Sequence, residues 1–146
     1  MSIPERSLSP EVAEDWIREV LRRDEGGAQL TVSGACMEPS LKEGSKITLR
    51  RFHGAARVGD VVLLQTAAGL RLHRVLLRFG DRVRTKGDRG IFLDPASSFS
   101  AIIGVCEATE SRLARLVRAA RSLARLLARP RAAPGRGDEA HARLLP

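Results

Sequence analysis

From residue 28 to about residue 107 the chain consists of short aliphatic and β-branched runs, separated by turn-forming pairs such as Gly-Asp, Ala-Gly and Asp-Pro. Runs of this length with frequent Gly, Asp and Pro punctuation are typical of strands rather than of helices. The pattern therefore predicts a mainly β fold, a compact antiparallel β-domain. The expected strands are residues 30–32, 46–49, 61–65, 70–72, 74–77, 82–84 and 102–105.

Amphipathic helices are expected on both sides of this β-domain. Ser9-Pro10-Glu11 is a helix start, and apolar residues then recur at helical spacing until Gly26-Gly27. Residues 111–129 form the second expected helix, which Pro130 stops. Leucines, valine and alanines share one face of this second helix and arginines share the other. The simplest expectation is that the apolar face covers the β-domain and the arginines point outward.

The chain thus divides into a helix within residues 1–27, a β-domain at 28–110, a basic helix at 111–130 and a tail at 131–146 whose composition is typical of disorder. At 146 residues, one globular domain with a substantial core is expected. We find neither a secretory signal nor an apolar run near the ~20 residues that span a bilayer. Two cysteines far apart in sequence give no disulfide framework. These features favour a cytoplasmic setting.

Positive charge is concentrated at the C-terminal end. Of the formal charge of +8, residues 111–146 carry +7 as nine Arg against Asp138 and Glu139, so the other 110 residues carry only +1. Residues 111–129 therefore have two further interpretations, peripheral contact with an anionic membrane or contact with nucleic-acid phosphates. Aromatic content of 3% leaves little for base stacking, so nucleic acid is not an expected partner. The histidines and cysteines lack metal-ligand spacing, and no cofactor is expected.

Three short motifs carry the residue types that acyl transfer needs. Cys36 lies in Gly-Ala-Cys-Met-Glu-Pro-Ser-Leu, His73 in Leu-His-Arg-Val, and two carboxylates, Asp88 and Asp94, follow in residues 85–95. A free thiol with a pKa of ~8.5 is mostly protonated at neutral pH and needs a base, for which imidazole is suited. Taken singly, each residue also fits a structural role, as a small buried cysteine, a core histidine or a turn aspartate.

In this order, the motifs resemble the signal peptidase I superfamily, which also contains the SOS-repressor (LexA-like) autoproteases. The resemblance covers roughly residues 30–107. In that family the first motif reads Gly-x-Ser-Met-x-Pro-x-Leu, and its serine is the nucleophile; here the position is Cys36. The His-Arg-Val around His73 is similar to the endoplasmic-reticulum and archaeal signal peptidases, whose base is histidine. In the bacterial type the base is lysine.

The resemblance implies a role for each site residue. Cys36 would be the nucleophile, His73 the base and Asp94 the acid that orients the imidazole. The pattern favours Asp94 over Asp88 for that role, and Asp88 would then be structural. Lys86 is an alternative base, although the family pattern gives it no such role.

The segment around Cys36 would support the chemistry. Backbone amides at Gly34, Ala35 and Cys36 are expected to form an oxyanion hole, because Gly34 permits close backbone approach. Met37 would pack beneath the nucleophile or line a pocket, and Pro39 would stiffen the segment that follows.

Two classes of function follow from these motifs. The first is a hydrolase, a signal-peptidase-like endopeptidase that cleaves an extended peptide or the leader of a precursor with a thiol in place of serine. The second is a catalytically inactive peptide-binding homologue that keeps the fold and binds an extended peptide as an added strand. The second stays open because sulfur is larger than oxygen, and a misplacement near 1 Å costs about 10²-fold in rate. A DNA-damage-type autoprotease matches less well, because no DNA-binding domain precedes the core.

Overall fold

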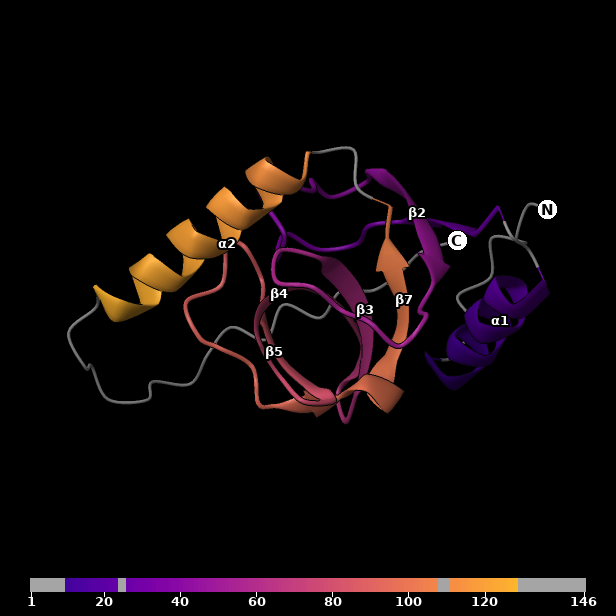
Figure 1. Ribbon diagram of the computed structural model, residues 1–146. Coiled ribbons are helices and arrows are strands. Elements are labelled where there is room, and N and C mark those ends of the chain that lie inside the picture. The colour runs from indigo at the N-terminus through magenta and orange to yellow at the C-terminus, as the bar shows by residue number, and fades with distance from the viewer. Residues whose placement is uncertain (1–9, 24–25, 108–110, 129–146) are drawn as a thin grey trace.

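The computed structural model describes residues 10–23, 26–107 and 111–128. Within these residues the strands form one antiparallel sheet in the order β1-β2-β7-β3-β4-β5-β6 (Figure 1), which confirms the expected mainly β architecture. The strands are β1 (Ala28–Thr31), β2 (Lys46–Arg51), β3 (Val61–Thr66), β4 (Gly69–Phe79), β5 (Arg82–Lys86), β6 (Ser97–Ser98) and β7 (Ile102–Cys106).

Strand β4 replaces two shorter expected strands. Residues 70–72 and 74–77 belong to one continuous element, because His73 stays in register opposite Val62 of β3. The pairing of β4 with β5 shifts between Val75 and Leu77, where a bulge interrupts the ladder. Strand β6 was not expected, since a two-residue serine pair carries no periodic signal; it pairs with Arg82 and Val83 of β5.

The sheet buries apolar side chains on both of its faces. Along β3, Leu63 packs in a cluster with Ile17 and Leu21 of α1 (Pro10–Arg23), whereas Val62 and Leu64 belong to a second cluster. Successive side chains of a strand point to opposite faces, so one strand serves both clusters. The helix expected near the N-terminus is confirmed; its proposed cap, Ser9, lies outside the described residues.

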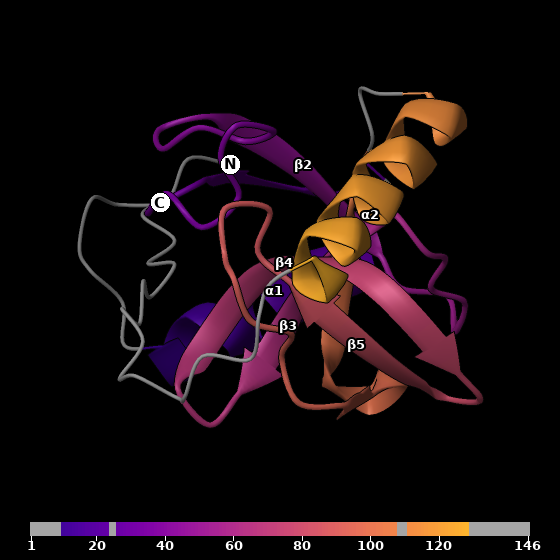
Figure 2. The same ribbon diagram turned by 90° about the vertical axis from the view of Figure 1, so that its left-hand side faces the viewer.

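Helix α2 (Arg112–Leu127) lies across the sheet from α1 and runs over β4, as the two views show (Figures 1 and 2). The Ser111 hydroxyl caps it by accepting a hydrogen bond from the Ala114 amide at 3.2 Å. The expected tail at 131–146 lies outside the described residues. Neither described helix has the length and apolar content needed to cross a bilayer.

The expectation that the apolar face of α2 covers the β-domain is wrong. The residues of α2 that are buried are Ala119 and Ser122, at 3% and 7% exposure. Most of its apolar face instead points outward: Leu113 is 70% exposed, Leu127 80%, and Leu116 and Val117 40% each, whereas Leu123 and Leu126 are half-buried.

Two buried charged groups of the β-domain explain this orientation. Asp60 and Lys86 are 7% and 2% exposed, and buried charges need partners. Arg115 of α2 donates to Asp60 Oδ1 at 2.6 Å, and Lys86 Nζ donates to Ser122 Oγ at 2.7 Å. Gly59 admits the close approach, because a Cβ there would lie 3.0 Å from the Arg115 backbone.

The magnitudes favour these polar contacts. Breaking a buried ion pair costs about 3–5 kcal/mol, and losing a hydrogen bond to a charged group costs about 1.5–3 kcal/mol. Burying the two most exposed leucines, Leu113 and Leu127, would return at most about 1.5–3 kcal/mol each. Losing both polar contacts, at about 4.5–8 kcal/mol together, is therefore comparable to or larger than the about 3–6 kcal/mol that burying the two leucines would return.

Candidate active site

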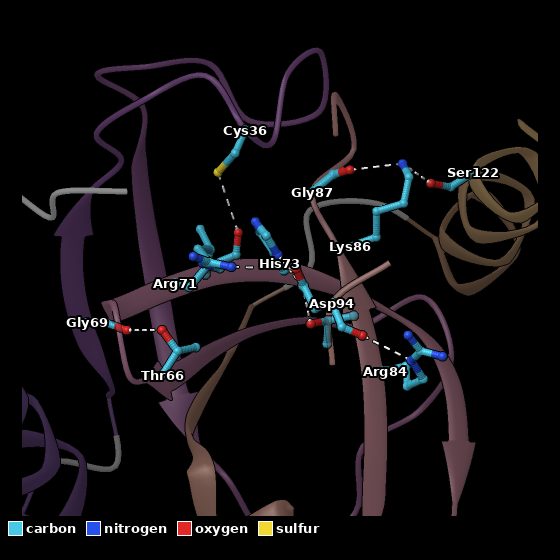
Figure 3. Close-up of polar contacts among 12 residues, drawn as sticks. Cys36, Thr66, Gly69, Arg71, His73, Arg84, Lys86, Gly87, Asp94 and Ser122 are labelled. Atoms are coloured by element: carbon cyan, nitrogen blue, oxygen red, sulfur yellow. Dashed lines mark hydrogen bonds and ion pairs between the residues drawn. The ribbon is translucent and has the colours of Figure 1, made fainter. Parts of the chain in front are cut away.

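Cys36 lies on the turn-rich segment between β1 and β2. Gly34 has a φ of +87°, and backbone hydrogen bonds from Glu38 to Ala35 and from Leu41 to Met37 close the following turns. Met37 is fully buried, whereas Pro39 is exposed after a cis peptide bond. The half-buried Cys36 thiol points toward β4, where it donates to the Leu72 carbonyl at 3.8 Å (Figure 3).

His73 projects from β4 on the side opposite to the buried Leu72. It is 7% exposed, and its Nδ1 lies 2.5 Å from Asp94 Oδ2. With Nδ1 held by a carboxylate, Nε2 is the ring nitrogen left for proton transfer. Figure 3 shows Cys36, His73 and Asp94 converging on one region from three separate segments of the chain.

Asp94 is held in place by β5. Its side chain accepts from Thr85 Oγ1 at 2.7 Å, and its amide donates to the Thr85 carbonyl at 2.8 Å. Arg84 Nε donates to the Asp94 carbonyl at 3.0 Å. The backbone and the carboxylate of Asp94 are thus both held by hydrogen bonds. The carboxylate that contacts the His73 ring belongs to Asp94 and not to Asp88.

Asp88 makes a different set of contacts. Its two carboxylate oxygens accept from Arg74 Nε at 2.8 Å and Nη2 at 2.7 Å, a bidentate pair. Ser40, from the Cys36 motif, also donates to Asp88 at 2.5 Å, and Arg74 Nη1 donates to the Gly59 carbonyl at 2.9 Å. Asp88 therefore ties the segment carrying Cys36 to β4, the structural role expected of it.

Gly87 lies where the segment that carries Cys36 meets His73. A Cβ at this position would lie 2.7 Å from the Cys36 carbonyl oxygen and 3.2 Å from His73 Nε2. The first distance is too short for any side chain, so glycine is required for this approach. The neighbouring Arg89 amide donates to the same Cys36 carbonyl at 3.0 Å. The sequence motif contained Gly87, but nothing in its spacing indicated this contact.

Lys86 is not placed to act as an alternative base. Its Nζ donates to the Gly87 carbonyl at 3.0 Å and to Ser122 of α2, on the far side of the segment from Cys36 (Figure 3). Lys86 therefore links α2 to the loop beside His73.

The resting site combines a protonated thiol with an ionised carboxylate. Burial raises the pKa of the Cys36 thiol, although its own backbone amide and Arg71 act in the opposite direction. Burial also works to raise the pKa of Asp94, but the hydrogen bond and charge of His73, the Thr85 hydroxyl and Arg71 together hold it below its usual value. Burial raises the pKa of the second thiol, Cys106, to about 11.

The backbone amides near the thiol are not equivalent. The Cys36 amide lies beside its own sulfur and lowers the pKa of that thiol. The Gly34 amide instead faces Glu43 Oε1 at 3.4 Å. Among the three amides of the expected oxyanion hole, at Gly34, Ala35 and Cys36, that of Cys36 is the one shown beside the Cys36 thiol. The oxyanion hole itself stays a prediction.

Arg71 belongs to the site and was missed by sequence reasoning. It lies two residues before His73 on the same face of β4, and its Nη1 is 3.6 Å from Asp94 Oδ1 (Figure 3). Its side chain is 23% exposed, and its charge lowers the pKa of both Cys36 and Asp94. The period of two in a strand was a signal that could have found it.

Arg71→Gln is expected to change the selectivity of Cys36 alkylation. Removing the cation lowers the ratio of iodoacetate to iodoacetamide rates at Cys36 about threefold to fivefold, because the anionic reagent loses an attraction of about 1 kcal/mol. It also shifts the pH profile of Cys36 alkylation to higher pH, because Arg71 lowers the pKa of this thiol. Peptide mass mapping separates Cys36 from Cys106. The exposed Arg82→Gln is the control, and an unchanged ratio in Arg71→Gln would contradict the assignment.

Comparisons with known proteins leave the family open. No family model matches this chain, and neither the curated proteins nor the solved structures give a significant match. Within residues 10–23, 26–107 and 111–128, no group of three or more His, Cys, Asp or Glu side chains is placed to hold a metal ion.

Proposed function

We propose that this protein is an endopeptidase with a β-domain of the signal peptidase type, in which Cys36 is the nucleophile, His73 the base and Asp94 the orienting acid. The observation that carries the proposal is the 2.5 Å contact between His73 and Asp94 beside the Cys36 thiol. The resemblance of the three motifs to the superfamily adds to it. The order of the three roles, nucleophile to base to orienting acid, is that of a triad.

Cleavage would begin with the thiol protonated. As the Cys36 sulfur attacks the scissile carbonyl carbon, His73 Nε2 takes the thiol proton, and ionised Asp94 stabilises the imidazolium that forms. The Cys36 amide would donate to the developing oxyanion. The imidazolium then returns its proton to the leaving amine, which departs and leaves a thioester on Cys36. Water, deprotonated by His73, hydrolyses the thioester to a carboxylate and restores the thiol.

The substrate class proposed is an extended peptide or precursor leader. Strand β1 is at one edge of the sheet in the described part of the chain and leads directly into the segment that carries Cys36. An extended peptide paired with the free edge of β1 would run toward the thiol, as in strand addition.

A catalytically silent peptide-binding module is the second candidate, and one observation favours it. Among the described residues, the acceptor for the Cys36 thiol is the Leu72 carbonyl and not the imidazole, and burial raises the pKa of that thiol. Catalytic hydrogen bonds are often long without substrate and shorten in the Michaelis complex, so this geometry does not exclude the peptidase.

Incubation with a sequence-diverse mixture of synthetic peptides separates the two candidates. We expect the full-length chain to produce new peptide termini detected by mass spectrometry, Cys36→Ala to produce none, and the matched Cys106→Ala to behave as the wild type. Intact-mass analysis during turnover should show an acyl adduct that maps to Cys36.

Two results would count against a peptidase that uses Cys36. Peptide binding by fluorescence anisotropy with neither cleavage nor an adduct would establish the silent module. Cleavage that persists in Cys36→Ala would exclude Cys36 as the nucleophile.

A further inference from the structure

The outer face of α2 is an apolar stripe open to solvent. We define the outer stripe as Leu113, Leu116, Val117, Ala120, Ala124 and Leu127, which share one side of the helix at spacings of three and four residues. All six are exposed, with Leu113 and Leu127 at 70% and 80%. Leucines this exposed, aligned on one helix, mark an interaction surface rather than scattered surface residues.

Contacts of the inner face of α2 with the sheet keep the outer stripe pointing away from the domain. Arg115 is bound to Asp60, Ser122 accepts from the buried Lys86, and Ala119 is buried against the sheet. The helix backbone also sits directly on Gly59. Rotating α2 to cover its stripe would break these contacts, so the partner of the stripe is not the sheet of the described domain.

The charge around the stripe indicates the chemistry of the partner. Residues 111–128 contain five arginines and no acidic residue. Arg121 and Arg125 are exposed along one flank of the stripe, and Arg112 is exposed along the other. A second copy of α2 packed on the stripe would bring these like charges together, which is unfavourable. An anionic surface with an apolar layer beneath it satisfies both the arginines and the leucines.

We propose that α2 lies on an anionic lipid bilayer, with the outer stripe inserted at the headgroup–acyl boundary and Arg112, Arg121 and Arg125 contacting lipid phosphates. An apolar stripe flanked by long cationic side chains is the pattern of helices that lie in the membrane interface. The proposal rests on α2 alone and is independent of the chemistry proposed for Cys36.

Vesicle co-sedimentation of the full-length chain tests it. We expect binding to phosphatidylcholine vesicles containing phosphatidylglycerol and little binding to pure phosphatidylcholine, with loss at high salt. The double variant Leu113→Ser/Leu127→Ser, which keeps every charge, should bind about tenfold or more weakly. Arg121→Gln/Arg125→Gln should bind on the order of 20-fold more weakly, because each cation near an anionic surface contributes about fivefold. Phe79→Ser, which removes an exposed apolar side chain from β4, is the control and should bind as wild type.

Three outcomes would overturn the proposal. The first is no binding to anionic vesicles. The second is equal binding by the wild type and Leu113→Ser/Leu127→Ser, which would assign binding to charge elsewhere in the chain. The third is a stable dimer in sedimentation velocity that dissociates in Leu113→Ser/Leu127→Ser, which would assign the stripe to a second copy. Circular dichroism of each variant confirms that the helix content is retained.

Discussion

Asp94→Asn is expected to slow peptide cleavage by about 10²- to 10⁴-fold while leaving the fold intact. The Asp94 carboxylate contacts His73 Nδ1 at 2.5 Å, and its pKa is held low enough to keep it ionised at neutral pH. An amide in its place offers no charge to stabilise the imidazolium and can present an N–H to Nδ1, which favours the wrong tautomer. The measurement is kcat on a peptide that the wild type cleaves.

The control for this prediction is Asp81→Asn, an exposed aspartate outside the site. It should cleave at the wild-type rate. Thermal unfolding of both variants excludes a difference that comes from stability. If kcat of Asp94→Asn stayed within about threefold of the wild type, Asp94 would not be the orienting acid of a triad.

Asp88→Ala is expected to destabilise the domain by about 3–5 kcal/mol, because it leaves the Arg74 guanidinium charged and buried. Arg74 is 2% exposed, and Asp88 supplies two of its hydrogen bonds. Ser40 would lose its acceptor at the same time, so the segment that carries Cys36 would lose a tie to β4. Urea unfolding gives the free-energy change.

A double variant distinguishes an unpaired charge from lost packing. Arg74→Met/Asp88→Leu should recover most of the lost stability, since replacing a whole buried ion pair with apolar groups is often neutral. Asp81→Ala should change the free energy of unfolding by less than about 0.5 kcal/mol. A loss below about 1 kcal/mol in Asp88→Ala, or no recovery in the double variant, would contradict this account.

The sheet was accessible from the sequence because its signals are local. Short runs between turn pairs marked six of the seven described strands, two of the expected runs merging into β4. The missing strand, β6, is a serine pair that forms only because β5 lies beside it. Propensity cannot indicate a strand whose pairing partner is its main cause.

The site residues that could be predicted from the sequence were those that lie in a motif. Cys36, His73 and the two aspartates each stood in a recognisable motif, and the structure places Asp94 rather than Asp88 on the imidazole. Arg71 and Gly87 were not assigned, because their roles arise from atoms on other segments. Their contacts exist only after β4, β5 and the Cys36 segment come together.

Helix α2 could be predicted from the sequence, but its orientation on the sheet could not. Spacing alone established that residues near 111–129 form a helix and that leucines and arginines occupy different faces. Which face turns inward depended on Asp60 and Lys86, two buried charges about 30 to 60 positions earlier in the chain. Leaving a buried charge unpaired costs more free energy than leaving a leucine exposed. Arg115 and Ser122 therefore face the sheet, where they contact Asp60 and Lys86, and the apolar face of α2 is exposed.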